Sequence, residues 1–383
     1  MISNRRNVTI VLCGLALSTG MAIAGAKAQS SAPQPPAAPK LAEEQFKNIQ
    51  ALKGVPADLV FPSMQFITAS LGVECEYCHV REGQKMEFDK DDKKTKVTAR
   101  KMMKMMFAIN KDNFEGHRQV TCYSCHRGAA EPVGVPIISE EESRPEAERS
   151  AAASPKPVLP PADQLLDKYL AAVGGEAALQ KVTSLVEKGN ITANGRQLPI
   201  EVYAKAPGKR LSVMHLPNGE SITAFDGKQG WLSNNGHAHL MSAAENDAER
   251  ISADMRFATN VKTLYKKFNV LPGEKIDGHD TYLVVGRNEG QPPLRLYLDQ
   301  QSGQLLRLVR YAETALGRMP TQIDYADYRD EGGVKIPLRW TLARPGGRFT
   351  IQISQVEQNV PVEDAKFAPP PLPPTPDQKP SGH

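Results

Sequence analysis

The chain has 383 residues, which is enough for two domains of ordinary size. Hydrophobic residues make up 40% and charged residues 23% of the sequence, and these values exclude a fibrous or a wholly disordered protein. The formal net charge of +4 includes three basic residues within residues 1–28, and without them it is +1, so we expect no nucleic-acid partner.

The first 28 residues have the pattern of a secretory signal peptide. Arg5 and Arg6 precede an apolar stretch, and Ala26-Lys27-Ala28 fits a cleavage site of the A-x-A type. We expect cleavage after this site and a periplasmic protein, either free or associated with the membrane. An uncleaved membrane anchor is the alternative. Cleavage removes one of the five cysteines, Cys13, and leaves four.

Proline-rich segments divide the rest of the chain, which holds 30 prolines in total. Such segments bury too little apolar surface to fold, and they connect the denser parts as flexible linkers. The expected boundaries are 29–40 for a leader, 41–132 for a first domain, 133–161 for a linker, 162–368 for a second domain and 369–383 for a tail.

The first domain is expected to be mainly α-helical. Pro62 suits a first helical turn and Gly72 suits a helix end, so we predict a helix that ends at Leu71. Residues 81–94 are highly charged and are predicted to form a solvated loop. A second helix is predicted over 95–110, with one apolar stripe formed by Met102, Met105, Met106 and Ile109.

The four remaining cysteines lie in two copies of the pattern C-x-x-C-H, Cys75-Glu76-Tyr77-Cys78-His79 and Cys122-Tyr123-Ser124-Cys125-His126. This pattern is typical of c-type haem attachment, because two thiols bond the haem vinyl groups and the adjacent imidazole binds the iron. Zinc sites seldom repeat an adjacent Cys-His, a thioredoxin-like pair needs a βαβ context, and disulfides leave both histidines unexplained. We therefore expect two covalently attached haem c groups, with His79 and His126 on the irons.

Each iron also needs a sixth ligand or an open position. Met64 lies on the predicted helix before the first motif, and the helix before the second motif carries Met102, Met103, Met105 and Met106. Methionines at helical spacing are commonly core residues, and spacing alone leaves both Met102 and Met105 open. His117 is a further alternative ligand, and Arg127 is either a partner of a haem propionate or a solvated side chain.

Residues 60–132 resemble the cytochrome c subunit of photosynthetic reaction centres, specifically one tandem pair of its haem segments. The similarity rests on Met64–Leu71 before the first motif, on Ala99-Arg100-Lys101-Met102 through Ala108-Ile109-Asn110, and on Val120–Gly128 around the second motif. The resemblance implies that Met64 is the sixth ligand of the first haem and Met102 that of the second. The family typically has four haem motifs where this chain has two, so a photosynthetic role is not implied.

The second domain is expected to be mainly β, a curled antiparallel sheet or half-barrel with covering helices. Helices are predicted near 164–173 and over 247–268, the second with an apolar face that extends to Phe268 and covers the concave side of the sheet. Turn dipeptides such as Asn218-Gly219 separate short alternating runs. The expected strands are 200–204, 211–216, 221–225, 282–286, 295–299, 305–311, 321–328 and 349–356.

This order of helix, curled sheet and covering helix resembles the periplasmic lipoprotein-carrier and sorting family, with residues 225–231 and 296–305 similar to its strand-turn-strand segments. The resemblance implies an apolar concavity for a lipid, a lipidated partner or another apolar molecule. The second domain shows no nucleophile motif, phosphate loop or acid pair. His237-Ala238-His239 follows a turn, and we interpret it as a surface strand end rather than a metal site.

Methionine-histidine ligation favours a raised reduction potential and iron closed to substrates. The sequence therefore predicts an exported dihaem c-type cytochrome, an electron carrier rather than an enzyme, that relays electrons between periplasmic redox proteins. A haem enzyme such as a peroxidase is the alternative if one iron has an open or displaceable position. A lipid or lipoprotein carrier with haem redox sensing is the third hypothesis.

Overall fold

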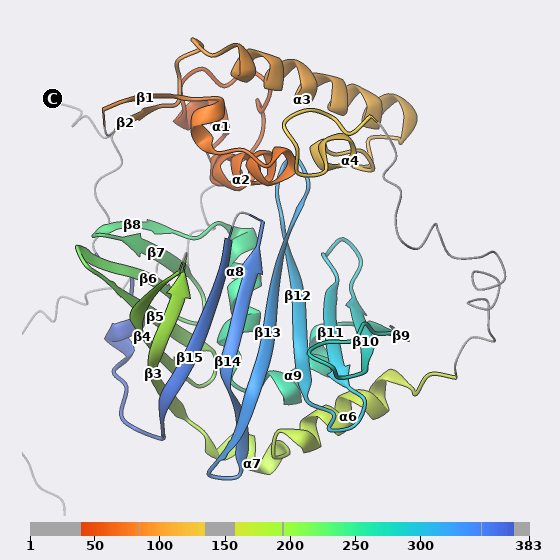
Figure 1. The fold of residues 1–383 in the computed structure, drawn as a ribbon, viewed down its shortest axis with the longest axis vertical. Coiled ribbons are helices and arrows are strands. Elements are labelled where there is room, and N and C mark those ends of the chain that lie inside the picture. The colour runs from red at the N-terminus through yellow and green to blue at the C-terminus, as the bar shows by residue number, and fades with distance from the viewer. Residues whose placement is uncertain (1–39, 84, 135–157, 194, 346, 371–383) are drawn as a thin grey trace, which may run out of the picture. The chain divides into compact units, whose positions relative to one another are not determined.

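A computed structural model describes residues 40–83, 85–134, 158–193, 195–345 and 347–370 (Figure 1). The expected signal peptide lies outside these residues, and so do most of the expected leader, linker and tail. No helix of the described residues is long and apolar enough to span a membrane.

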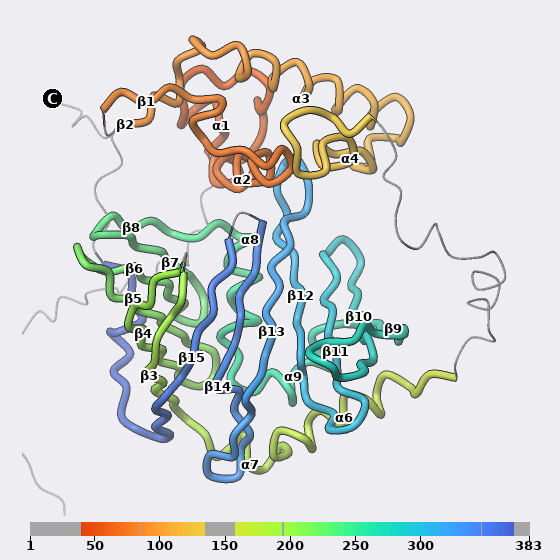
Figure 2. Tube along the Cα trace, in the orientation of Figure 1, coloured from red at the N-terminus to blue at the C-terminus, as the bar shows by residue number. Residues whose placement is uncertain are grey.

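The first part of the described chain is mainly helical, as expected, and we call residues 40–134 the helical region (Figure 2). Its elements are α1 (Ala42–Gln45), η1 (Ala57–Leu59), α2 (Val60–Leu71), η2 (Cys75–Tyr77), β1 (Val80–Glu82), β2 (Lys85–Glu87), α3 (Lys94–Asn113) and α4 (Cys122–His126).

Helix α2 begins and ends close to where the sequence predicts. Pro62 lies in its first turn, where the missing N–H of proline costs no helical hydrogen bond. Gly72 follows the last helical residue with φ of 64°, a left-handed conformation that glycine adopts without strain. Phe66 and Ile67 are buried on the inner face of the helix.

Two expectations about the helical region are wrong in detail. The buried residues of α3 are Lys96, Met103, Met106 and Asn110, whereas Met102 and Met105 of the expected stripe are exposed. Met102, Met103, Met105 and Met106 spread over roughly half of the helix circumference, so periodicity could not identify which of them face inward. The expected loop 81–94 instead contains the antiparallel hairpin β1–β2.

The second part of the described chain, residues 158–370, forms one antiparallel sheet of 13 strands, which we call the sheet region. The strand order is β8-β7-β6-β5-β4-β3-β15-β14-β13-β12-β11-β10-β9. The strands are β3 (Ser184–Ala193), β4 (Arg196–Lys205), β5 (Lys209–Leu216), β6 (Gly219–Phe225), β7 (Gly230–Asn234), β8 (His237–Leu240), β9 (Lys267–Pro272), β10 (Thr281–Arg287), β11 (Leu294–Asp299), β12 (Leu305–Glu313), β13 (Arg318–Glu331), β14 (Val334–Arg344) and β15 (Gly347–Gln358).

The eight expected strands are all present, and β3, β7, β8, β9 and β14 are additional. The sheet is open, because β8 and β9 at its two ends are not paired with each other. Four helices and a 3-10 turn accompany the sheet in the described residues: α6 (Ala162–Ala172), α7 (Glu176–Lys181), α8 (Ala243–Ala253), α9 (Phe257–Leu264) and η3 (Asp364–Phe367).

The main core lies between these helices and the sheet. Leu166 of α6 and Val261 of α9 are fully buried against Leu296 and other strand residues, which buries a large apolar area and stabilises this part of the fold. The expected helical face over 247–268 is confirmed in its central part. Its continuation to Phe268 is wrong, because this residue belongs to the edge strand β9.

Candidate haem-binding site

The first C-x-x-C-H motif lies in the tight turn that follows α2. Cys75 begins the 3-10 turn η2, and Cys78 and His79 follow it. The N-terminal end of α3 fixes this turn, because Thr95 Oγ1 donates a hydrogen bond to the carbonyl of Tyr77 and Lys93 Nζ donates one to the carbonyl of Glu76. The motif is therefore held at one end of α3.

The second motif forms the short helix α4 and is fixed by the other end of α3. Asn110 is 5% exposed, and its Oδ1 accepts hydrogen bonds from the backbone N–H groups of Gln119 at 3.0 Å and Val120 at 2.9 Å. Its Nδ2 donates to the carbonyl of Val120 at 2.7 Å. One buried amide thus holds the segment that enters the second motif.

A close backbone contact connects the two motifs. Gly128 N donates a hydrogen bond to the carbonyl of Ser70 at 2.9 Å, and a Cβ on Gly72 would lie 2.1 Å from the carbonyl oxygen of Gly128. Cys75 and Cys125 each lie three residues from this contact. Because three extended residues span at most about 11 Å, the Cα atoms of these two cysteines are less than about 30 Å apart.

The side chains of the motifs fit covalent haem. All four thiols are free although each pair lies within one turn of chain. His126 Nδ1 is 3.0 Å from the carbonyl oxygen of Ala129, and a hydrogen bond there leaves Nε2 available as a ligand. His79 Nδ1 is buried and has no hydrogen-bond partner of good geometry among the described residues, and the His79 ring packs edge-on against Phe88.

Burial shifts the pKa values of a histidine and two cysteines of the motifs. It lowers the pKa of His79, with the positive charge of Lys96 acting in the same direction, and so favours the neutral imidazole. Burial also raises the pKa of the Cys78 and Cys122 thiols. Neutral imidazole is the form in which histidine binds metals.

The methionines differ in their surroundings. Met103 and Met106 are buried in a cluster with Phe66 and Ile67, so they are core residues. Met102 and Met105 are 42% and 50% exposed. Their thioethers are therefore free of the core. Met64 is half-buried and packs against the same cluster as Cys122, so α2 contacts the second motif as well as leading to the first.

Three other sequence candidates lie at the surface. His117 and Arg127 are exposed. Arg127 has φ of 50° and ends α4 in a left-handed conformation. His237 and His239 are exposed on β8 at the edge of the sheet. In the described part of the chain, no group of three or more His, Cys, Asp or Glu side chains has the arrangement of a metal site.

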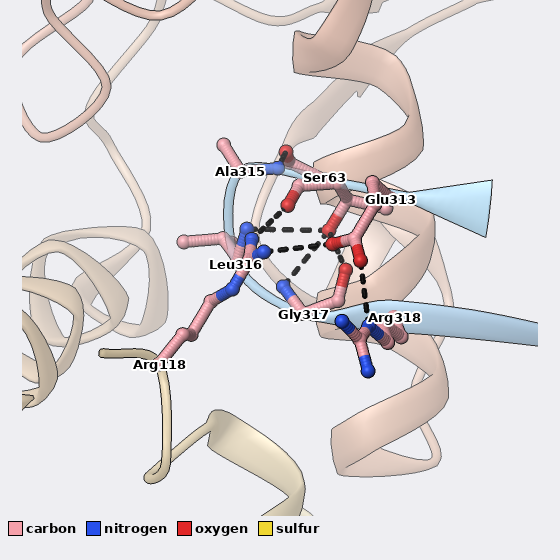
Figure 3. A network of polar contacts seen from close by, with 8 residues as sticks. Ser63, Arg118, Glu313, Ala315, Leu316, Gly317 and Arg318 are labelled. Carbon is pink, nitrogen blue, oxygen red and sulfur yellow. Dashed lines mark hydrogen bonds and ion pairs between the residues drawn. The ribbon is translucent and has the colours of Figure 1, made fainter. Parts of the chain in front are cut away.

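The hairpin loop between β12 and β13 completes the core of the helical region (Figure 3). Leu316 is fully buried against Phe66, Met103 and their neighbours. The Ser63 hydroxyl accepts a hydrogen bond from Ala315 N at 3.2 Å.

The side chain of Arg118, which precedes the second motif, forms hydrogen bonds with the same hairpin loop. It donates to the carbonyl of Thr314 and to Glu313 at 2.7 Å. No sequence pattern predicts this contact, because it joins residues almost 200 positions apart.

The concave side of the sheet contains a cavity of about 1040 Å³. Its walls are mostly apolar, with Leu308, Ile323 and Ile336 from the strands and Met255 from the segment between α8 and α9. Ala69 and Val73, at the end of α2, also line it, so the cavity extends to the segment that leads into the first motif. A cavity of this size is at the upper end of the range for ligand sites.

Comparison with known proteins supports the first resemblance. Residues 16–159 match the family model of the photosynthetic reaction centre cytochrome C subunit. The protein of this name from Roseobacter denitrificans is 36% identical over 101 residues, which is 24% of this chain and 27% of that protein. Cytochrome c-554 from Chloroflexus aurantiacus is 32% identical over 89 residues, 21% of this chain and 20% of that protein.

These residues therefore define a segment similar to c-type cytochromes. The chain spans only about a fifth to a quarter of the length of the curated relatives it matches.

Among solved structures, the chain is similar to a putative outer membrane lipoprotein-sorting protein domain from Vibrio parahaemolyticus, with a TM-score of 0.38 and 12% identity over 53% of this chain and 94% of that one. A LolA superfamily protein from Nitrosomonas europaea gives a TM-score of 0.36 and 13% identity over 55% of this chain and 98% of that one. A likeness at this level concerns the fold alone.

Proposed function

We propose that this protein is an exported dihaem c-type cytochrome that relays electrons between periplasmic redox proteins. The observation that carries the proposal is the pair of C-x-x-C-H motifs, fixed at the two ends of α3 and joined by the contact between Gly72 and Gly128. The similarity to cytochrome c subunits over the same residues supports it.

The residues have distinct roles in this proposal. Cys75 and Cys78 would hold the first haem and Cys122 and Cys125 the second, each through two thioether bonds. His79 and His126 would each supply a histidine ligand to an iron, and Met64 and Met102 would each supply a methionine ligand. When bound, each haem supplies an iron that accepts and releases one electron. The methionine ligands would raise the reduction potential, which favours the reduced iron, and would keep substrate from binding to the iron.

Substitution of the methionines tests the carrier function against an enzymatic one. We expect Met102→Ala to remove the methionine-to-iron absorption band of one haem and to lower its reduction potential, whereas Met105→Ala, one turn away, leaves both unchanged. Met64→Ala is expected to do the same to the other haem. A five-coordinate, high-spin haem in the wild-type protein would contradict the carrier function and favour a peroxidase-like enzyme.

We also propose that the sheet region binds an apolar ligand or a lipidated partner. The apolar cavity of about 1040 Å³ carries this second proposal. Native mass spectrometry of protein purified without detergent tests it. We expect a bound lipid that organic extraction removes, and delipidated protein that takes up no lipid from membrane extracts would contradict it.

A further inference from the structure

The cavity contains charged side chains within its apolar walls. Arg210 of β5 and Arg310 of β12 line it together with Glu187 of β3 and Glu249 of α8. These residues lie far apart in the sequence and meet only because the sheet curls under α8. Charged groups in such a position cost desolvation free energy unless partners compensate for it.

The positive groups are incompletely paired within the cluster. Arg210 and Arg310 share one carboxylate, that of Glu249, at N–O distances of 3.6 and 3.5 Å. Two guanidinium groups carry about ten N–H donors, far more than one carboxylate accepts. The Nε of Arg310 is buried and has no hydrogen-bond partner among the described residues.

Among the described residues, no carboxylate other than that of Glu249 forms an ion pair with Arg210 or Arg310. Burial raises the pKa of Glu187 to about 7, with Arg210 acting in the opposite direction, so this side chain is only partly ionised near neutral pH. Glu245 also lines the cavity, but its Oε2 already accepts hydrogen bonds from Ser242 N and Oγ at 2.8 and 2.9 Å. Arg344 lines the cavity as well and adds a further positive charge.

The arginines are also well placed to hold a ligand. The Arg210 guanidinium lies over the ring of Trp340, 5.9 Å from the ring centre, which restricts its position. Apolar side chains of Ile323 and Met255 line the same cavity. A ligand with an acid group at one end and a hydrocarbon chain at the other would satisfy both parts of the cavity.

We propose that the cavity binds an amphipathic anion, with its carboxylate or phosphate group on Arg310 and Arg210 and its alkyl chain against the apolar walls. This inference rests on the proposed ligand-binding function of the sheet region and specifies the chemical class of the ligand. The acid group would supply the acceptors that Arg310 Nε and the shared guanidinium groups lack.

A matched series of ligands tests the inference on the full-length, haem-loaded and delipidated protein. Dodecanoate, dodecyl phosphate and dodecanol have the same chain and differ in the end group, and isothermal titration calorimetry gives the affinity of each. We expect at least one of the two acids to bind with one-to-one stoichiometry, about tenfold or more tightly than the alcohol. The stronger acid identifies the carboxylate or the phosphate as the preferred group.

Arg310→Met removes the unpartnered guanidinium, and we expect it to abolish the preference for the acid over the alcohol. Arg329→Met is the matched control, because Arg329 is an exposed residue of the same sheet and lies outside the cavity. If Arg310→Met does not fold, Arg210→Met serves the same purpose, and the wild-type comparison of acid with alcohol needs no variant.

The other outcomes separate this inference from the proposed function. Equal binding of acids and alcohol would overturn the acid-group inference and leave the apolar-ligand function intact. Failure of all three to bind would overturn both. Acetate or inorganic phosphate binding as tightly as the long-chain acids would show a small-anion site and also overturn the inference.

Discussion

The helical region and the sheet region differ in how much apolar core they contain. Among the described residues, eight buried hydrophobic side chains lie in the helical region and forty in the sheet region, a difference larger than the difference in length. The sheet region buries its apolar residues between helices and strands. The core of the helical region instead includes Leu316 from the sheet region. On our proposal, two haems add further apolar surface to this core. Small domains with little core commonly depend on such additional groups.

This comparison predicts that the haems stabilise one region and not the other. A covalently attached haem stays on the chain in the unfolded state, so it stabilises the folded state through the iron ligation and the apolar burial that are gained on folding. The sheet region, whose core is formed by residues such as Leu166 and Leu296, should fold without that contribution.

Removal of one haem attachment site should have the largest effect on the stability of the helical region. We expect Cys75→Ala with Cys78→Ala to eliminate one haem per chain and to expose the backbone amides of the helical region, because the haem replaces missing core. Haem quantification and hydrogen exchange by mass spectrometry measure both changes. Unchanged exchange in the helical region would show that its core is sufficient without haem. Exchange in the sheet region is expected to stay constant.

Truncation of Leu316 tests the contact between the two regions. The side chain is fully buried, and Leu316→Ala is expected to cost about 2–5 kcal/mol through the cavity it creates. Hydrogen exchange should increase in α2 and α3. Leu298→Ala in β11 is the matched control, because this leucine is equally buried but packs only in the core of the sheet region. Equal effects of both substitutions on α2 would contradict the assigned role of Leu316.

The buried Glu187 makes the sheet region sensitive to pH. Its pKa is raised from 4.5 to about 7, so the folded state binds the proton more tightly than the unfolded state. The contribution of Glu187 to stability is therefore highest below pH 4.5 and falls as the pH rises to 7, by at most about 3 kcal/mol.

We expect Glu187→Gln to remove this decrease and to be more stable than the wild type above pH 7. Denaturant unfolding at several pH values measures the free energy of unfolding of both proteins. Glu289→Gln, at an exposed position, is the control and should retain the wild-type pH dependence. A wild-type profile that is flat between pH 5 and 7 would contradict the prediction.

The buried amide of Asn110 should have a smaller effect. Asn110→Ala leaves the N–H groups of Gln119 and Val120 without their acceptor, at a cost of about 1–3 kcal/mol. In Asn110→Ala we expect faster hydrogen exchange in the segment before the second motif and unchanged exchange at the first motif. Asn113→Ala is the control, because Asn113 is exposed on the same helix. Equal exchange in the two variants would contradict the role given to Asn110.

The two regions also differ in what the sequence could predict. Local patterns identified the haem motifs and the end of α2 at Gly72, because attachment chemistry and helix capping depend on neighbouring residues. Turn dipeptides located most strands. Strand β14 was not predicted, because it contains Pro337 and proline is unusual within an inner strand.

Features that depend on long-range contacts could not be predicted from the sequence. The Leu316 contact and the cluster of Arg210, Arg310 and Glu249 arise when distant strands and helices meet. The inner face of α3 was predicted incorrectly because its four methionines are chemically equivalent. Only the packing of Met103 and Met106 against α2 distinguishes them.

The central claim is that the four cysteines of the two motifs hold two haems. Intact-protein mass spectrometry of material from the periplasm, with thiol alkylation of the denatured protein, tests it most directly. We expect two haem additions per chain, cleavage after residue 28 and no alkylated cysteine. A mass without haem, or with four alkylated or disulfide-bonded cysteines, would contradict it.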